Sequence, residues 1–175
     1  MRNSNRIESK TFTRLVTSTP QTPQRYRKSR NSTPTSPAAN VAWLRSSATF
    51  SYIGETREAR RRADIGLRLS PYDAHVFYSY SIIALASYAA GDYADAAMWA
   101  RRSAALNPHF TANLRFLAAS LAASGKIDEA RQVSADLLRV HPQFSVSRFV
   151  ETHAFKDPAK RRLFGEHLLQ AGLPE

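Results

Sequence analysis

The sequence predicts an all-α fold built from helical hairpins that repeat along the chain. Three segments share the pattern Gly-x-x-x-acid-Ala, and each is followed by a helical apolar pattern that ends at a proline, always at the same distance from the glycine. No stretch shows the sustained period-two alternation that is typical of a strand. We therefore expect a solenoid of about three hairpin repeats with an additional capping helix at its C-terminal end.

The segment 1–39 is predicted to form a disordered basic tail. Residues 1 to 40 carry eight basic side chains against one acidic side chain, with four Ser/Thr-Pro pairs and no glycine. Such a segment buries too little apolar surface to offset the entropy cost of ordering. One hypothesis for its function is electrostatic contact with nucleic acid or an anionic membrane, and the alternative is a solvated leader without a specific ligand. The basic-tail candidates are Arg25, Arg27, Lys28 and Arg30.

The repeated region follows the tail. The repeating segments are GETREA (54–59), GDYADA (91–96) and GKIDEA (125–130), and the prolines that end the repeats are Pro71, Pro108 and Pro142. Glycines and prolines recur with the same spacings, and the first spacing is longer than the second, which places a three-residue insertion after Pro71. Each glycine permits a tight turn between two antiparallel helices, the alanine allows their close approach, and the proline ends the second helix. The pattern predicts helices over approximately 40–53, 55–69, 74–90, 92–106, 110–124 and 126–140.

Small and large residues recur in phase with these landmarks. Counting back from the glycines places repeat starts at Asn40, Phe77 and Thr111. The fourth repeat position is large (Trp43, Tyr80, Leu114), the eighth is small (Ser47, Ala84, Ala118) and the twentieth is alanine (Ala59, Ala96, Ala130). The eleventh position is large in two repeats, whereas the second repeat has Ser87 there.

This arrangement resembles the tetratricopeptide repeat family, whose period is about 34 residues. The resemblance covers 40–144, as three repeats at 40–73, 77–110 and 111–144. It implies a right-handed solenoid and a non-enzymatic protein that binds a protein or peptide partner in a concave groove lined by the first helix of each repeat. By repeat position, the groove candidates are Tyr52, Tyr78, Tyr88 and Arg115, and the alternative for Tyr78 and Tyr88 is that they pack within their own repeat. The groove is expected to be apolar and aromatic with one cation, which suits an amphipathic helix or an extended peptide.

Residues 145–175 are predicted to cap the solenoid. Asp157 and Pro158 form a helix start, because Asp is a favoured N-cap and Pro is favoured at the first helical position. A helix over 160–171 follows, and its apolar face holds Leu163, Phe164, Leu168 and Leu169. A solenoid needs an atypical last element to cover its exposed core, so this helix is interpreted as the cap.

A looser resemblance rests on short strings near the C-terminus. NPHF at 107–110, FKDPAKRRLF at 155–164 and the terminal AGLPE are similar to the C-terminal tail of bacterial class III adenylate/guanylate cyclases and of winged-helix regulators that bear these repeats. This resemblance implies an alternative function, as a severed regulatory segment that lacks the catalytic or DNA-binding domain.

The sequence favours no catalytic, cofactor or metal site. It has no cysteine, which excludes thiolate zinc sites and cysteine nucleophiles, and its six glycines are isolated, which excludes Gly-rich phosphate loops. The five histidines never form a metal-binding i, i+4 pair with a nearby Glu. The longest weakly polar stretch, 77–90, is too short to span a membrane, so we expect a cytoplasmic protein without a transmembrane segment. The basic run at 60–62 is interpreted as a solvated convex face, with contact to an acidic partner as the alternative.

Overall fold

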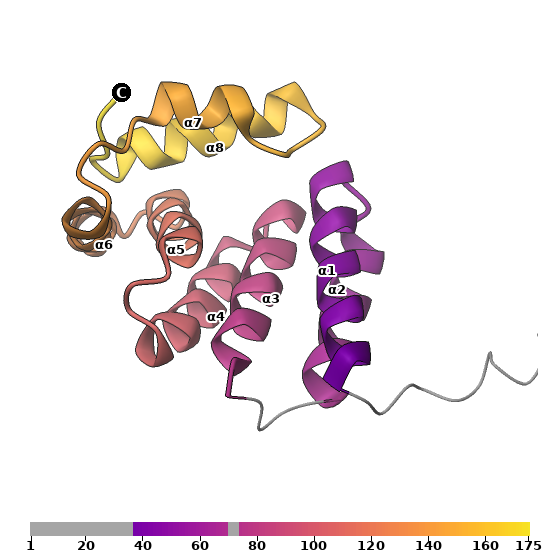
Figure 1. Cartoon of the computed structure of the whole chain (residues 1–175). Coiled ribbons are helices and arrows are strands. Elements are labelled where there is room, and N and C mark those ends of the chain that lie inside the picture. The colour runs from indigo at the N-terminus through magenta and orange to yellow at the C-terminus, as the bar shows by residue number, and fades with distance from the viewer. Residues whose placement is uncertain (1–36, 70–73) are drawn as a thin grey trace, which may run out of the picture. The chain divides into compact units, whose positions relative to one another are not determined.

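The computed structural model describes residues 37–69 and 74–175, which form eight helices and no strand (Figure 1). The prediction of an all-helical fold is therefore confirmed. The helices are α1 (Pro37–Ile53), α2 (Thr56–Leu69), α3 (Val76–Ala90), α4 (Tyr93–Leu106), α5 (Thr111–Ala123), α6 (Ile127–Val140), α7 (Val146–Thr152) and α8 (Pro158–Gln170). The first six lie where the sequence predicted them, with ends that differ only slightly.

The first six helices pack as consecutive hairpins. Within the hairpins, α1 packs against α2, α3 against α4, and α5 against α6, while α2 contacts α3 and α4 contacts α5. The first helices of the hairpins are also neighbours, because α3 contacts both α1 and α5. This is the packing of a helical-hairpin solenoid, in which each repeat buries its apolar face against the next.

The turns and close contacts depend on the small residues that recur in the sequence. The turn glycines have φ values of 91° at Gly54, 88° at Gly91 and 74° at Gly125, a left-handed conformation that glycine adopts without steric cost. The alanines at the twentieth repeat position are fully buried, and in the first repeat the Ser47 hydroxyl donates a 2.7 Å hydrogen bond to the carbonyl of Ala59. The two helices of this hairpin therefore approach closely enough for a side chain to bond the opposing backbone.

The C-terminal region contains two helices, of which the sequence analysis predicted only the second. The short helix α7 begins after Ser145, whose hydroxyl accepts a 3.3 Å hydrogen bond from the backbone N–H of Arg148. Helix α8 begins as predicted, with the Asp157 carboxylate accepting a 2.8 Å bond from the N–H of Ala159. Helix α8 packs against α5 and against α7, which lies beside it (Figure 1).

Some predictions fall outside the described part of the chain. The tail candidates Arg25, Arg27, Lys28 and Arg30 lie there, as does Pro71, the predicted end of the first repeat. Within residues 37–69 and 74–175, no helix has the length and hydropathy of a membrane-spanning segment.

Candidate functional site

The four predicted groove residues lie on three neighbouring first helices. Tyr52 is on α1, Tyr78 and Tyr88 are on α3, and Arg115 is on α5. Tyr52 lies close enough to both Tyr78 and Arg115 to feel them electrostatically: burial and the neighbouring Tyr78 raise the pKa of Tyr52, and Arg115 opposes that rise. The structure therefore brings three of the predicted residues together, each of them partly exposed.

Arg115 is a cation surrounded by aromatic rings. Its guanidinium carbon lies 4.7 Å from the ring centroid of Phe149 and 5.9 Å from that of Phe144. Burial lowers the pKa of Arg115, although the side chain stays protonated at neutral pH. Within the described residues, Arg115 forms no ion pair, in contrast to Arg60 and Arg101, which contact carboxylates. Its guanidinium lies over the ring faces of Phe149 and Phe144.

Tyr88, the fourth predicted residue, is buried instead of facing an open groove. Its exposed fraction is 5%, and its hydroxyl is 2.8 Å from Nδ1 of His167 on α8. Its ring lies 5.0 Å from that of Phe164 in an edge-on arrangement. Burial, with a contribution from Tyr93, raises the pKa of Tyr88. Tyr88 is therefore a contact between α3 and α8 in this structure.

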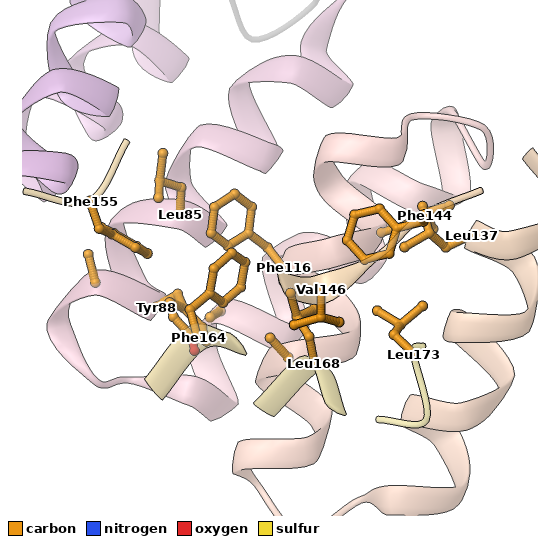
Figure 2. Packing of buried hydrophobic residues seen from close by; sticks show 14 residues of the cluster. Leu85, Tyr88, Phe116, Leu137, Phe144, Val146, Phe155, Phe164, Leu168 and Leu173 are labelled. Carbon is orange, nitrogen blue, oxygen red and sulfur yellow. The ribbon is translucent and has the colours of Figure 1, made fainter. Parts of the chain in front are cut away.

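The residues that cover Tyr88 come from the C-terminal segment, defined here as residues 146–173. Phe155 and Phe164 of this segment are 2% and 0% exposed. The Phe164 ring is stacked on Phe116 of α5 at 5.0 Å, and the Phe155 ring meets Tyr52 of α1 edge-on at 5.5 Å. Figure 2 shows Phe155, Phe164, Tyr88 and Phe116 gathered in one cluster. The C-terminal segment thus contacts the first helix of all three repeats.

Polar contacts hold the C-terminal segment at its edges. The backbone N–H of Lys156 donates a 2.8 Å hydrogen bond to the carbonyl of Tyr52. The Lys160 ammonium donates another, also 2.8 Å, to the carbonyl of Ala89. Ala89 is in the last turn of α3, where carbonyls lack intrahelical donors and a cation is favourable. Both bonds tie the segment to backbone groups of first helices.

His153 lies at the centre of these contacts, and the sequence analysis did not single it out. Its ring is 4.7 Å from Phe155, 5.0 Å from Phe164 and 5.0 Å from Phe149. Burial, together with the positive charges of Arg115 and Arg161, lowers the pKa of His153 to about 4. The imidazole is therefore neutral at physiological pH. The density of aromatic residues between 144 and 164 is the sequence signal that could have identified this cluster.

On α2, the basic run at 60–62 is largely neutralised by neighbouring acids. Arg60 donates to the Asp95 carboxylate at 2.6 Å and to the Ser87 hydroxyl at 2.9 Å. Burial alone would raise the pKa of Asp95, but hydrogen bonds from Ser87 and Arg60 hold it below its usual value. Arg61 and Arg62 both donate to Glu58, at 2.9 Å and 2.7 Å.

These pairings support the interpretation of this run as a structural and solvated face. They also explain why a small polar residue stands at the eleventh position of the second repeat: the buried Ser87 donates a 2.7 Å hydrogen bond to Asp95, within the network that joins α2 to α4. A large apolar side chain would remove this link.

Within the described residues, no group of three or more His, Asp or Glu side chains lies close enough together to hold a metal ion. The residues that cluster here are aromatic and cationic.

Comparison with known proteins adds one finding. Residues 87–149, which run from the end of α3 into α7, match the family model described as Tetratricopeptide repeat. No curated protein sequence matches the chain significantly. The match does not extend to the looser cyclase resemblance, which stays a prediction. With its hairpins in the register that the sequence predicted and this match over α4 to α6, the region 87–149 of the chain is identified as tetratricopeptide repeat.

Proposed function

We propose that this protein is a non-enzymatic interaction module that binds a peptide or helix of a protein partner on the face formed by α1, α3 and α5. Tetratricopeptide repeats are in general protein-interaction modules. The proposal goes further in choosing the concave face, defined here by Tyr52, Tyr78 and Arg115. A cytoplasmic location belongs to the proposal as well.

The observation that carries the proposal is the state of Arg115. It is a partly buried cation that pairs with no carboxylate among the described residues, and it lies near Tyr52 of α1, which in turn lies near Tyr78 of α3. A carboxylate of a partner would form a charge-assisted hydrogen bond with the guanidinium, which is among the stronger contacts available to a protein surface. Apolar or aromatic side chains of the same partner would pack on Tyr52 and Tyr78. The expected ligand is therefore a peptide that combines an acidic residue with neighbouring apolar residues.

The test begins with a display selection of random peptides against the full chain. The affinity of the selected peptides is then measured by fluorescence anisotropy for the wild type and for Arg115→Ala and Tyr78→Ala. We expect the selected peptides to be enriched in Asp or Glu, and each substitution to weaken binding about tenfold, which corresponds to about 1.4 kcal/mol.

Arg61→Ala is the matched control, because Arg61 is an exposed arginine on α2 that already pairs with Glu58. The Arg61→Ala chain should bind the selected peptides with the same affinity as the wild type. Selected peptides that lose binding in Arg61→Ala but keep it in Arg115→Ala would refute the concave-face proposal and favour the basic face of α2.

A further inference from the structure

The C-terminal segment does not continue the stacking of the repeats. Each earlier first helix packs against the first helix before it, as α3 does on α1 and α5 on α3. In contrast, α7 is only a short helix, and α8 packs on α5. The connection between α7 and α8 then reaches α1, where Lys156 bonds the carbonyl of Tyr52 at 2.8 Å. The segment therefore crosses the first helices, and a peptide that occupied this face would cross them in the same way.

Helix α8 has the two-sided character of a helix bound in a groove. Phe164 and Leu168, one turn apart, are fully buried on its inner side. Leu163 and Leu169 on its outer side are 39% and 43% exposed, although the sequence analysis had placed them on the same apolar face. Anchors one turn apart on a single face are typical of helix-in-groove recognition.

The C-terminal segment and an external ligand of Arg115 would compete for the same groups. Phe149 of the segment lies over the guanidinium at 4.7 Å, and Phe155 and His153 meet the Tyr52 ring at 5.5 Å and 5.7 Å. A carboxylate that reached the guanidinium while its neighbours packed on Tyr52 would have to replace these contacts.

We infer that residues 146–173 are an internal ligand of the concave face, and that a partner binds there only when this segment is released. The inference rests on the proposed function, because it assigns the regulation of the same face. The N–H of Val146, the first residue of the segment, donates a 2.9 Å hydrogen bond to the carbonyl of Pro174, which directly follows its last residue, so α7 and α8 leave as one hairpin. The loop at 141–145, between α6 and α7, is the hinge.

Competition of this kind lowers the apparent affinity of any external ligand. A tethered segment acts as if present at a concentration on the order of millimolar. The apparent dissociation constant equals the intrinsic one divided by the fraction of molecules whose face is free. Weakening the segment without altering the concave face should therefore strengthen binding of an external ligand.

The probe for this test is a synthetic peptide of residues 146–175 with a fluorescein at its N-terminus, added to the full chain and followed by anisotropy. Phe155→Ala in the chain weakens the internal copy and leaves the concave face intact. We expect the peptide to bind this variant at least tenfold more tightly than the wild type. Lys160→Ala is a milder second variant that removes only the bond to Ala89, and it should strengthen binding about threefold.

Leu163→Ala is the matched control, because it truncates an exposed residue of the same helix and should bind the peptide as the wild type does. A peptide in which Phe155 and Phe164 are both replaced by alanine should not bind any variant. Hydrogen exchange provides an independent measure: saturating peptide should raise the exchange of the α8 amides in the Phe155→Ala chain.

The inference is overturned if folded Phe155→Ala and Lys160→Ala chains bind the peptide no better than the wild type. It is also overturned if Phe155→Ala forms a dimer by light scattering while the α8 amides stay protected, because the segment would then be exchanged between chains. Display-selected peptides that depend on Arg115 but bind wild type and Phe155→Ala equally would overturn this inference and leave the proposed function standing. If the probe peptide binds Phe155→Ala tightly but no selected peptide depends on Arg115, the proposed function fails and the internal ligand stands.

Discussion

Replacing Phe164 by alanine should remove the main anchor of α8. The side chain is fully buried, and its ring lies 5.0 Å from the rings of Phe116, Tyr88 and His153. Truncating a buried phenylalanine removes its transfer free energy and leaves a cavity, which together cost about 3–5 kcal/mol. We expect a loss of this size in the free energy of unfolding, and a fall in melting temperature of roughly 10 °C or more. Urea and thermal unfolding followed by circular dichroism in the far ultraviolet measure both.

Two further variants make this result interpretable. Leu163→Ala, one residue earlier on the exposed side of α8, should cost less than about 1 kcal/mol. The double variant Phe164→Ala/Phe155→Ala should lose less unfolding free energy than the sum of the losses in the two single variants. The two rings contact each other, and destabilisation stops once the C-terminal segment is released. If Phe164→Ala unfolds at the same urea concentration as Leu163→Ala, α8 is not docked in solution and the reasoning fails.

Two other perturbations test local features. Acid should destabilise the protein between about pH 6.5 and 4.5. The pKa of His153 is lowered to about 4 in the folded protein, whereas it is about 6.5 in the unfolded chain. The contribution of the neutral imidazole to stability is therefore complete above about pH 6.5 and is lost as the pH falls toward about 4, because the unfolded chain then binds the proton more tightly. One pKa unit corresponds to about 1.4 kcal/mol, and solvent screening of the partly exposed ring reduces the expected loss of unfolding free energy to about 1–2 kcal/mol. Urea midpoints measured across this pH range give the loss. The variant His153→Phe keeps a ring near Tyr52, Arg115 and Arg161 but cannot take up a proton, so its stability should depend less on pH. Gly125→Ala should lower the free energy of unfolding by about 1 kcal/mol, because φ at this turn is 74° and alanine is strained there even though the space around it is open. Gly125→Asn should cost less, because asparagine tolerates the left-handed conformation better. Equal melting temperatures for the two variants would contradict this account.

The sequence by itself determined the hairpins and their register. Positive φ at Gly54, Gly91 and Gly125 and the ends of the second helices at prolines are local constraints, which act on the backbone wherever the rest of the chain lies. The buried alanines at the twentieth position follow from the same local geometry, because only a small side chain allows two helices of one hairpin to approach closely. These effects extend over one repeat or less, so a single sequence suffices to read them.

The sequence also predicted groove residues from their repeat positions, but it did not determine what lies over them. The hydroxyl of Tyr88 contacts His167, which lies far away in the sequence, and the ring of Tyr52 contacts Phe155. Helical periodicity shows that α8 has an apolar side, and it does not show which surface that side will cover. It also did not separate Phe164, which is buried, from Leu163 beside it, which is exposed.

Only the tertiary structure decided that the C-terminal segment lies across the first helices. Its docking depends on the fit of several rings contributed by α1, α3 and α5, and on backbone carbonyls that become available only when those helices are in place, such as that of Ala89 for Lys160. The same is true of Ser87, which departs from the repeat pattern and is explained by Arg60 and Asp95 on two other helices. Contacts of this kind join residues far apart in the sequence, and their free energy depends on the complementarity of the assembled surfaces, which no local pattern encodes.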